Sequence, residues 1–335
     1  MIYLAEFVVV NLWISGVISA LGEEAHMGSS AWRYIFYSVL ALSVVILVIR
    51  LQAWLLIKTR LQLKEKEAAL QLLENQRDIL EIKNRNITES LNYAQRIQEA
   101  LLPTEDLIKN SFSSAFILNR PRDIVSGDFY WLGGTGERRY IVVADCTGHG
   151  VPGALISMIG HDLLDKIINT ESDEHPGTIL DRMNKALSET FRRGKESGTI
   201  IRDGMDIGIC VVDMKKKKIE FAGAFIPMFL IRENRLLEVK GDKYVLGMLP
   251  PGASYSKNEF DLMDNDIIYL FSDGYVDQFG GEDNKKFMMR RFRYLLMTIH
   301  TFPLPDQKVI LDENIKTWSG TNPQVDDILV IGIKP

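Results

Sequence analysis

An uncharged run near the N-terminus constrains the fold of this chain more than any other feature. Residues 34–49 contain no charged side chain, and beyond Arg50 the apolar run continues through residues 51–57. As one helix with a rise of about 1.5 Å per residue, residues 34–57 would be ~36 Å long, enough to cross a hydrocarbon core of ~30 Å. Because nothing nearby in the sequence could cover so apolar a rod, we predict a transmembrane helix rather than a buried globular helix.

A second apolar stretch, residues 2–21, precedes this run and is interrupted by Glu6 and Asn11. A signal peptide would normally carry Lys or Arg before its apolar region, and none is present here. We therefore predict a first transmembrane helix and a membrane region over residues 1–57. Lys58 and Arg60 follow closely, and basic residues are enriched on the cytoplasmic side of membrane spans, so the rest of the chain is expected in the cytoplasm.

Residues 58–102 are predicted to form a helical coiled-coil linker. No Gly or Pro interrupts them, and Pro103 would end the helix. With Leu63 as position a of a heptad, position d is apolar in five successive heptads, whereas three of the six a positions are apolar. This pattern favours a parallel homodimer in which polar a residues fix the register. For residues 86–102, packing of one amphipathic helix on the following domain fits equally well.

The third region, residues 103–335, carries 29 basic and 34 acidic residues, and so the whole excess negative charge of a chain with formal net charge −5. Proteins that bind nucleic acid present a basic face or stripe, so nucleic acid is not an expected partner. Only two cysteines occur, Cys146 and Cys210, which excludes a disulfide framework and suits a reducing compartment.

Short apolar runs separated by turn residues alternate in this region with longer segments of helical periodicity. Helices are predicted over residues 152–169 and 176–193. Strands are predicted over residues 139–144, 207–212, 219–222, 228–231, 236–239, 267–271 and 328–333. Short loops between successive strands favour antiparallel pairing with helices on the outside, which is an α+β domain.

Four aspartates share one context, the edge of a hydrophobic strand: Asp128, Asp145, Asp273 and Asp326. Any one of them alone is more simply explained as a turn residue. If they converge, two carboxylates ~4 Å apart repel by about 4 kcal/mol at an effective dielectric constant of 20, and divalent cations would relieve that repulsion. An oxygen-only ligand set suits Mg²⁺ or Mn²⁺ rather than zinc. Spacing along the chain does not by itself show convergence.

Four motifs carry a resemblance to a known family: residues 126–131 (Ser-Gly-Asp-Phe-Tyr-Trp), 145–154 (Asp-Cys-Thr-Gly-His-Gly-Val-Pro-Gly-Ala), 271–281 (beginning Phe-Ser-Asp-Gly) and 326–328 (Asp-Asp-Ile). In this order they resemble the PPM-type (protein phosphatase 2C-like) serine/threonine phosphatases of the bacterial sporulation stage II protein E branch. The resemblance extends from about residue 93 to the C-terminus. It implies two stacked antiparallel sheets flanked by helices, with two Mn²⁺ or Mg²⁺ ions at the sheet edges.

The resemblance also implies roles for individual residues. The expected metal-site residues are Asp128, Asp145, Cys146 through its carbonyl, Asp273 and Asp326. Asp145 resembles the ligand that bridges the two ions, and Asp128 resembles the carboxylate that orients the attacking water; these two are the expected catalytic residues. Asp327 is a close rival of Asp326, because a shift of one residue reverses the face of a strand.

Three further residues are candidates for contact with the substrate. Arg122 could bind the phosphate bidentately, His149 could act as a general acid or orient water, and Asp206 matches a family position near the metal site or substrate. Each also has a purely structural alternative, respectively a solvated loop, a tight turn and the start of a strand.

One departure from the family pattern concerns residues 222–227. Family members commonly show Ala-Gly-Ala-Asn-Asn-Pro, whereas this chain has Phe225 and Ile226 in place of the two amides. If these positions line the substrate groove, the choice of partner is expected to differ or the activity to be reduced.

Together these features predict a phosphatase anchored in the bacterial inner membrane that acts on phosphoserine or phosphothreonine of a signalling protein. By the resemblance, that protein could be a phosphorylated anti-sigma-factor antagonist. The alternatives are a non-catalytic signalling scaffold with the same fold, driven by coiled-coil dimerisation, and an enzyme acting on small phosphate esters.

Overall fold

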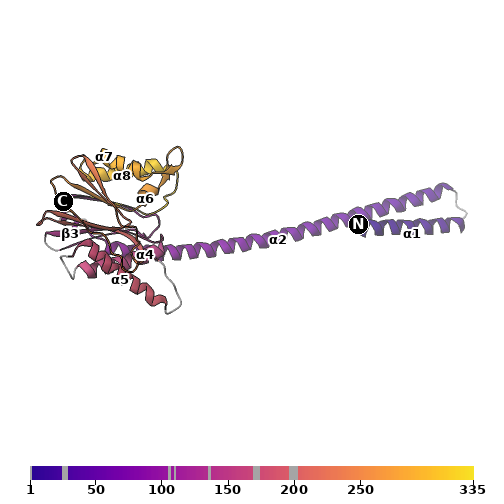
Figure 1. Cartoon of the computed structure of the whole chain (residues 1–335). Helices are drawn as coiled ribbons and strands as arrows, with labels where there is room; N and C mark the ends of the chain where they lie inside the picture. Colours follow the sequence, from indigo (N-terminus) through magenta and orange to yellow (C-terminus); the bar gives the residue numbers. More distant parts are fainter. Residues whose placement is uncertain are drawn as a thin grey trace. The chain divides into compact units, whose positions relative to one another are not determined.

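The computed structural model describes residues 2–24, 29–104, 107–108, 111–134, 137–168, 174–195 and 203–335 (Figure 1). The chain divides into two compact units, Met1–Asn86 and Ile87–Pro335. Residues 25–28, which belong to the loop expected between the two membrane helices, lie outside the described residues. The second unit begins well before the domain boundary expected after residue 102, so the end of the linker helix belongs to it.

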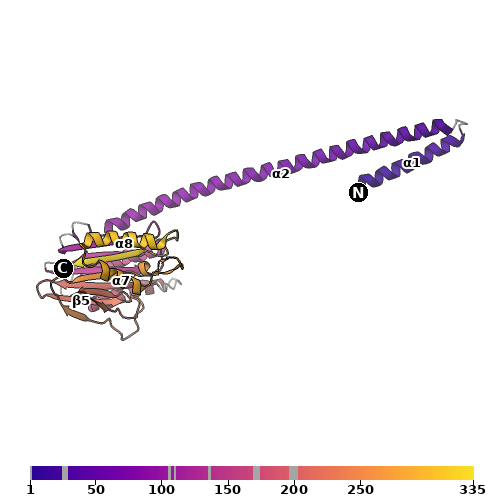
Figure 2. The ribbon, with the colours of Figure 1, turned by 90° about the horizontal axis from the view of Figure 1, so that it is seen from above.

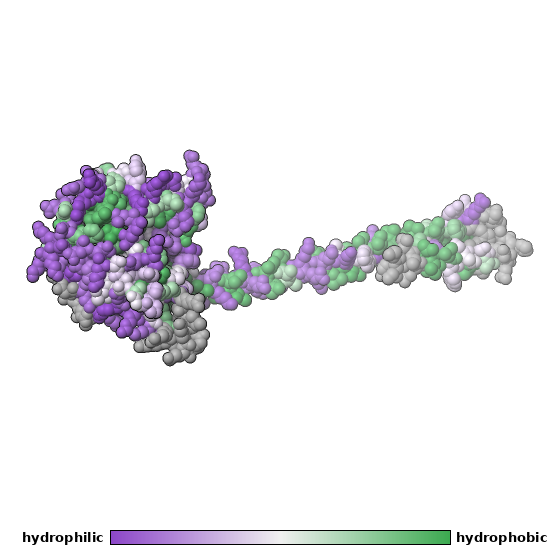
Figure 3. Space-filling view, viewed as in Figure 1, coloured by the Kyte–Doolittle hydropathy of each residue, from purple (hydrophilic) through white to green (hydrophobic). Residues whose placement is uncertain are grey.

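Two helices make up the N-terminal part of the chain. Helix α1 (Ile2–Glu24) is followed by α2 (Ser29–Leu101), one continuous helix of 73 residues that covers both the expected membrane helix and the expected linker. Within the described residues, α2 is the one helix long and apolar enough to cross a membrane, and α1 contains a shorter apolar segment, Phe7–Val17. Figure 3 shows α2 to be hydrophobic over its first half, with hydrophilic residues farther along. Membrane insertion and coiled-coil pairing remain predictions.

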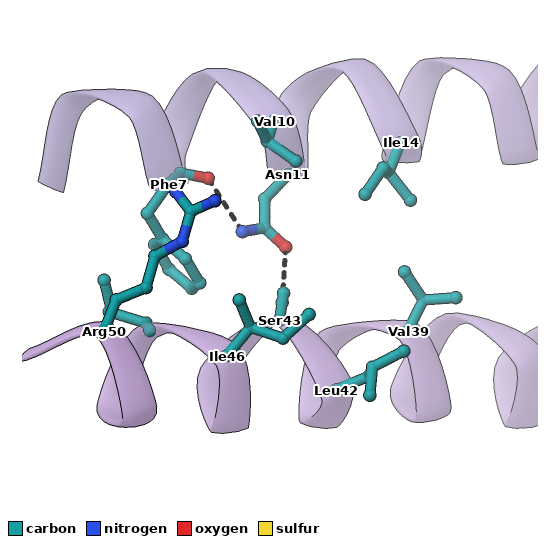
Figure 4. A pocket seen from close by; sticks show the side chains of 10 residues that line it. Phe7, Val10, Asn11, Ile14, Val39, Leu42, Ser43, Ile46 and Arg50 are labelled. Carbon is teal, nitrogen blue, oxygen red and sulfur yellow. Dashed lines mark hydrogen bonds between the residues drawn. The ribbon is translucent and has the colours of Figure 1, made fainter. Parts of the chain in front are cut away.

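A polar contact joins α1 to α2 among mostly apolar side chains (Figure 4). The Ser43 hydroxyl donates to the Asn11 side-chain oxygen at 2.9 Å, while the Asn11 amide nitrogen donates to the Phe7 carbonyl at 2.7 Å. A cavity of about 380 Å³ lies beside this contact and is lined mainly by apolar residues, with Arg50 among them. The two helices therefore form a hairpin in which this polar pair satisfies its hydrogen bonds internally, as an apolar environment requires.

Two five-stranded antiparallel sheets form the C-terminal unit (Figures 1 and 2). The first sheet has the spatial order β1 (Ser114–Arg120), β12 (Ile328–Lys334), β9 (Ile267–Phe271), β6 (Met228–Arg232) and β7 (Arg235–Val239). The second sheet has the order β2 (Phe129–Gly133), β3 (Arg138–Cys146), β4 (Met205–Asp213), β5 (Lys218–Ala224) and β8 (Asn258–Asp261). A small third sheet pairs β10 (Phe279–Gly280) with β11 (Lys285–Lys286). The predicted α+β fold with antiparallel sheets and outer helices is confirmed.

Successive side chains of each strand point to opposite faces of its sheet. Each sheet can therefore pack one face against the other sheet and its second face against helices. In β3, Ile141 and Val143 join Leu230 and Ile331 of the first sheet in the core between the two sheets. Tyr140, on the other face of β3, belongs to a separate core cluster against α4 (Val151–Ile168) and α5 (Pro176–Lys195). The outer face of the first sheet is covered by α7 (Met289–Ile299) and α8 (Leu304–Ser319) (Figure 1). The result is four layers, with helices on both outer faces.

A buried ion pair fixes the end of the second sheet that lies away from the aspartate motifs. Arg138, at the start of β3, donates to Glu220 at 2.7 Å and to Asp213 at 3.4 Å, and all three side chains are buried. Breaking such a pair by removing one partner leaves an uncompensated charge in the protein interior.

Candidate metal centre and active site

Strand register brings three of the predicted aspartates into one row. The antiparallel pairing of β3 with β4 places Asp145 directly opposite Asp206. The pairing of β2 with β3 places Phe129 opposite Ala144. Asp128, the residue before β2, therefore lies at the same edge of the sheet as Asp145. Residues directly opposite one another in a sheet share a face, and the three carboxylates therefore gather at one edge of the second sheet.

The first sheet contributes two more carboxylates to this edge. Asp273 lies between the end of β9 and the short helix α6 (Gly274–Asp277), and Asp326 lies just before the start of β12. Because β9 and β12 are antiparallel neighbours, with Phe271 paired to Val330, the end of one strand and the start of the other meet at the same edge. The Asp145 carboxylate lies within hydrogen-bonding reach of both Asp128 and Asp273. The expected convergence is found.

The electrostatics of these carboxylates reflect both burial and crowding. Burial, and then the charges of Asp273, Asp326 and Asp206, raise the pKa of Asp145 to about 8. Burial and the neighbouring Asp145 raise the pKa of Asp128 well above its ordinary value, and burial with Asp273 raises the pKa of Asp206 to about 6. The pKa values of Asp273 and Asp326 are raised by desolvation and neighbouring carboxylates. The fold thus holds five acidic side chains close together, at a distance where their ionised forms repel one another.

Divalent cations with a preference for oxygen fit this donor set. Asp128 is 4% exposed, and its Oδ2 atom has no hydrogen-bond partner among the residues that the structure describes. No group of three or more His, Cys, Asp or Glu side chains within the described part of the chain could hold an ion by itself. Mg²⁺ keeps several water ligands and uses one or two carboxylates per ion, so carbonyls and water would complete its coordination.

The environment of Cys146 disfavours its thiol as a metal ligand. Burial and the neighbouring aspartates raise the pKa of the Cys146 thiol, so a thiolate ligand is disfavoured. A Cβ atom built on Gly127 would lie 2.8 Å from the Gly148 carbonyl oxygen and 3.3 Å from the Cys146 carbonyl oxygen. The glycine of the first motif therefore lets its backbone approach the turn after Asp145 more closely than other residues allow.

The neighbours Asp326 and Asp327 have different environments. Asp327 is buried, and its two carboxylate oxygens accept hydrogen bonds from the backbone amides of Arg122 and Gly127, each at 2.7 Å. Asp326 accepts the backbone amide of Asp327 at 2.9 Å and raises the pKa of Asp145. The carboxylate of Asp327 therefore holds the loop before Asp128 and acts on Asp128 by its charge, whereas Asp326 is the member of the pair whose charge acts on Asp145.

Arg122 and His149 lie at the rim of the site. The Arg122 guanidinium is exposed and donates to the Val325 carbonyl at 2.9 Å, and the His149 Nδ1 atom lies 3.0 Å from the Asp123 carboxylate. The charges of both residues lower the pKa of Asp326, which places them on its side of the cluster. Asp206, the third residue considered for substrate contact, belongs to the carboxylate row itself.

Gln98 of α2 contacts the same loop and was not singled out from the sequence. Its side-chain nitrogen donates to the Ser126 carbonyl at 2.7 Å and to the Ser157 hydroxyl at 2.9 Å, while its oxygen accepts the Ser126 amide at 3.1 Å. Gln98 thereby joins the end of α2 to helix α4 and to the backbone two residues before Asp128. In the heptad pattern it was simply one of the polar a positions.

The two residues that depart from the family pattern lie in different environments. Ile226 is buried in the core between the sheets and packs beside Gly208, so it does not line a groove. Phe225 is 45% exposed. Only one of the two changes therefore faces the surface near the site.

Two stacked antiparallel sheets with outer helices and a carboxylate cluster at their common edge define a phosphatase domain of the protein phosphatase 2C type. The model of the stage II sporulation protein E (SpoIIE) family matches residues 135–335, and the chain belongs to this family. The solved SiaA-PP2C domain of Pseudomonas aeruginosa is similar, with 33% identity and a TM-score of 0.68, over 75% of this chain and 98% of that domain.

Two curated relatives from Bacillus subtilis also match. They are named phosphoserine phosphatase RsbP and phosphoserine phosphatase RsbU, and each is 26% identical over 199 residues, which is 57% of this chain. The alignment covers 46% of RsbP and 54% of RsbU. The chain thus spans about half the length of these relatives.

Proposed function

We propose that this chain is a Mn²⁺- or Mg²⁺-dependent phosphatase that hydrolyses phosphoserine or phosphothreonine on a signalling protein. One observation carries the proposal: five carboxylates from both sheets meet at one edge, and burial together with the charges of Asp273, Asp326 and Asp206 raises the pKa of Asp145. Repulsion among these carboxylates destabilises the folded chain, and bound divalent cations would remove that repulsion. The names of the two curated relatives support the same reaction.

The residues would divide the work as follows. Asp145, Asp273, Asp326 and the carbonyl of Cys146 would hold the two cations, with Asp128 at the same centre. When bound, the cations supply Lewis acidity for the attacking water and positive charge opposite the phosphate. Asp128 would orient that water, because its buried Oδ2 atom is available as a hydrogen-bond acceptor.

The rim residues would bind the phosphate and the substrate. Arg122 is exposed beside Asp326, and a guanidinium can donate two parallel hydrogen bonds to a phosphate. His149, held by Asp123, would donate to the phosphate or the leaving oxygen, and Asp206 would support the cluster from β4.

The test is hydrolysis of p-nitrophenyl phosphate and of a phosphoserine peptide by the full chain with Mn²⁺. The double variant Asp145→Asn with Asp273→Asn should lose at least ~100-fold in kcat, because the removal of preorganised charge at a reacting centre has effects of this size. Asp264→Asn, an exposed aspartate in the turn before β9, is the matched control and should retain full activity. An active double variant would refute the assigned chemistry.

We further propose that the chain is anchored in the bacterial inner membrane, faces the cytoplasm and dimerises through α2. The length and apolar composition of α2 support anchoring, and Lys58 with Arg60 supports the orientation. Leu73 and Leu80, on the predicted d seam, are about 60% exposed in the single chain, and pairing with a second helix would cover them.

An anti-sigma-factor antagonist is the proposed class of phosphorylated substrate, on the strength of the family resemblance. Calorimetry with Mn²⁺ separates this proposal from the scaffold alternative, since a scaffold that has lost its site would bind no cation tightly. Of the two changes that favoured a scaffold, Ile226 belongs to the core, which weakens that alternative.

A further inference from the structure

We propose that Phe225 is a specificity-determining residue whose exposed ring contacts an apolar side chain next to the phosphorylated residue of the protein substrate. This inference rests on the proposed function and deepens it, because it states which flanking chemistry the site selects. It is supported by the place of Phe225 just beyond the end of β5, by its backbone conformation and exposure, and by the residues beside it.

Phe225 follows directly on the strand that borders the carboxylate row. The pairing of β4 with β5 ends at Ile207 and Ala224, and Phe225 is the next residue. Ile207 is in turn paired with Ala144, the residue before Asp145. Neighbouring strands are about 4.8 Å apart, which places the backbone of Ala224, from which Phe225 turns away, ~10 Å from that of Ala144.

This separation suits a neighbouring residue of a polypeptide. In an extended peptide, the residues one and two positions from a phosphoserine lie ~3.5 and ~7 Å along the chain, and their side chains extend farther. A phosphate held at the Asp145 cluster would therefore bring a flanking side chain within reach of the Phe225 ring. A small ester lacks the atoms to make this contact.

The backbone at Phe225 is strained, and burial of the ring does not compensate for the strain. Its φ angle is 58°, in the left-handed region that bulky residues rarely adopt, and its amide donates to the Asp242 carbonyl at 2.8 Å. Asn, the residue of the family pattern noted above, tolerates this region better than Phe. A large aromatic side chain that is 45% exposed at such a position gains little by packing. Strain of this kind is concentrated at functional positions.

Other exposed apolar side chains lie on the segment beside Phe225. After Asp242, this segment carries Tyr244 and Met248, which are both more than 40% exposed. Between them, Leu246 pairs with Met205, the residue before Asp206, so the segment runs alongside the carboxylate row. This segment thus presents two large exposed apolar side chains, with the exposed Lys243 beside them, which would favour apolar rather than acidic or neutral polar residues next to the phosphate.

The experiment compares two short phosphoserine peptides that differ only at the two positions on either side of the phosphoserine, which are leucines in one peptide and glutamines in the other. We expect the full wild-type chain to favour the leucine peptide about tenfold in kcat/KM, consistent with burial of part of an aromatic ring. Phe225→Asn should reduce this preference to about twofold or less, and Phe225→Tyr should retain it. The ratio between peptides is the readout because a general loss of folded enzyme lowers both rates equally.

Phe302→Asn is the matched control, since Phe302 is an equally exposed phenylalanine in the turn between α7 and α8. This variant should keep the wild-type preference and the wild-type rate on p-nitrophenyl phosphate. An active wild-type enzyme that does not discriminate between the peptides, or a Phe225→Asn variant that discriminates like wild type, overturns this inference alone. A wild-type chain inactive on all phosphate esters overturns the proposed function and this inference with it.

Discussion

The substitution Asp145→Asn should stabilise the C-terminal unit when no divalent cation is bound. Burial and neighbouring carboxylates raise the pKa of Asp145 from 3.8 to about 8 in the folded chain. At ~1.4 kcal/mol per unit, this shift of about four units corresponds to ~6 kcal/mol of destabilisation above pH 8 and to ~4 kcal/mol near pH 7, where the folded carboxyl is still mostly protonated. Because Asp145 retains partial access to solvent, we expect a gain of about 2–3 kcal/mol for the uncharged amide.

The sign of the pH dependence follows from the same shift. Between pH values of about 4 and 8 the folded chain binds more protons at Asp145 than the unfolded chain, so the stability of the cation-free wild type should fall as the pH rises through this window. The advantage of Asp145→Asn should therefore be small near pH 4 and full above pH 8. Added Mn²⁺ should reverse the order of stability, because at the proposed site it would bind tightly only to the folded wild type.

The assay is urea unfolding of residues 87–335 in a chelator, followed by the fluorescence of Trp131 and Trp318, at several pH values and again with Mn²⁺. Asp264→Asn serves as the control and should change stability by less than about 0.5 kcal/mol. A cation-free Asp145→Asn variant no more stable than wild type at neutral pH would refute the view that these carboxylates repel one another in the folded chain.

Three further outcomes are expected. Gln98→Ala should lower the free energy of unfolding by about 1–3 kcal/mol and slow hydrolysis, because the loop before Asp128 loses its contacts with α2. Unchanged kinetics would show that this contact is only structural. Leu73→Cys, on the predicted d seam, should form an intermolecular disulfide on mild oxidation, whereas Leu72→Cys should not. Equal cross-linking of the two variants would argue against the assigned heptad register. Arg138→Met should cost about 3–5 kcal/mol in urea unfolding without affecting Mn²⁺ affinity, while loss of the exposed pairs of Lys218 should leave the unfolding midpoint nearly unchanged.

Local patterns in the sequence were sufficient for elements whose apolar runs are bounded by turn residues. The strand predicted over residues 267–271 has those bounds in the structure, and the helices predicted over 152–169 and 176–193 differ from α4 and α5 by one or two residues. Strand β1 and helices α7 and α8 were not predicted. In β1 only Phe116 and Leu118 are buried, so its alternation is too short to separate it from a loop.

The sequence could suggest that the aspartates converge, but it could not establish that they do. Asp145 meets Asp206 through the register of β3 and β4, and it meets Asp273 and Asp326 only because the two sheets stack with their edges aligned. Neither relation is encoded in local spacing. The choice between Asp326 and Asp327 likewise depends on the hydrogen bonds that Asp327 makes with distant backbone amides.

Gln98 illustrates a different limit. A polar residue at an a position produces the same heptad pattern whether it faces a partner helix or the backbone of a neighbouring domain. In this chain Gln98 faces the neighbouring domain, because its side chain donates hydrogen bonds to Ser126 and Ser157. The periodicity of the linker could not have distinguished this arrangement from a contact with a partner helix.

The hydrogen bond from the Gly127 amide to Asp327 spans 200 residues of sequence, and β12, the strand that follows Asp327, lies between β1 and β9 in its sheet. Contacts of such high sequence separation slow folding. During synthesis on the ribosome, this backbone contact can form only after Asp327 has been made. A nascent chain that stops short of Asp327 therefore lacks the carboxylate that holds the loop before Asp128 beside the carboxylate cluster.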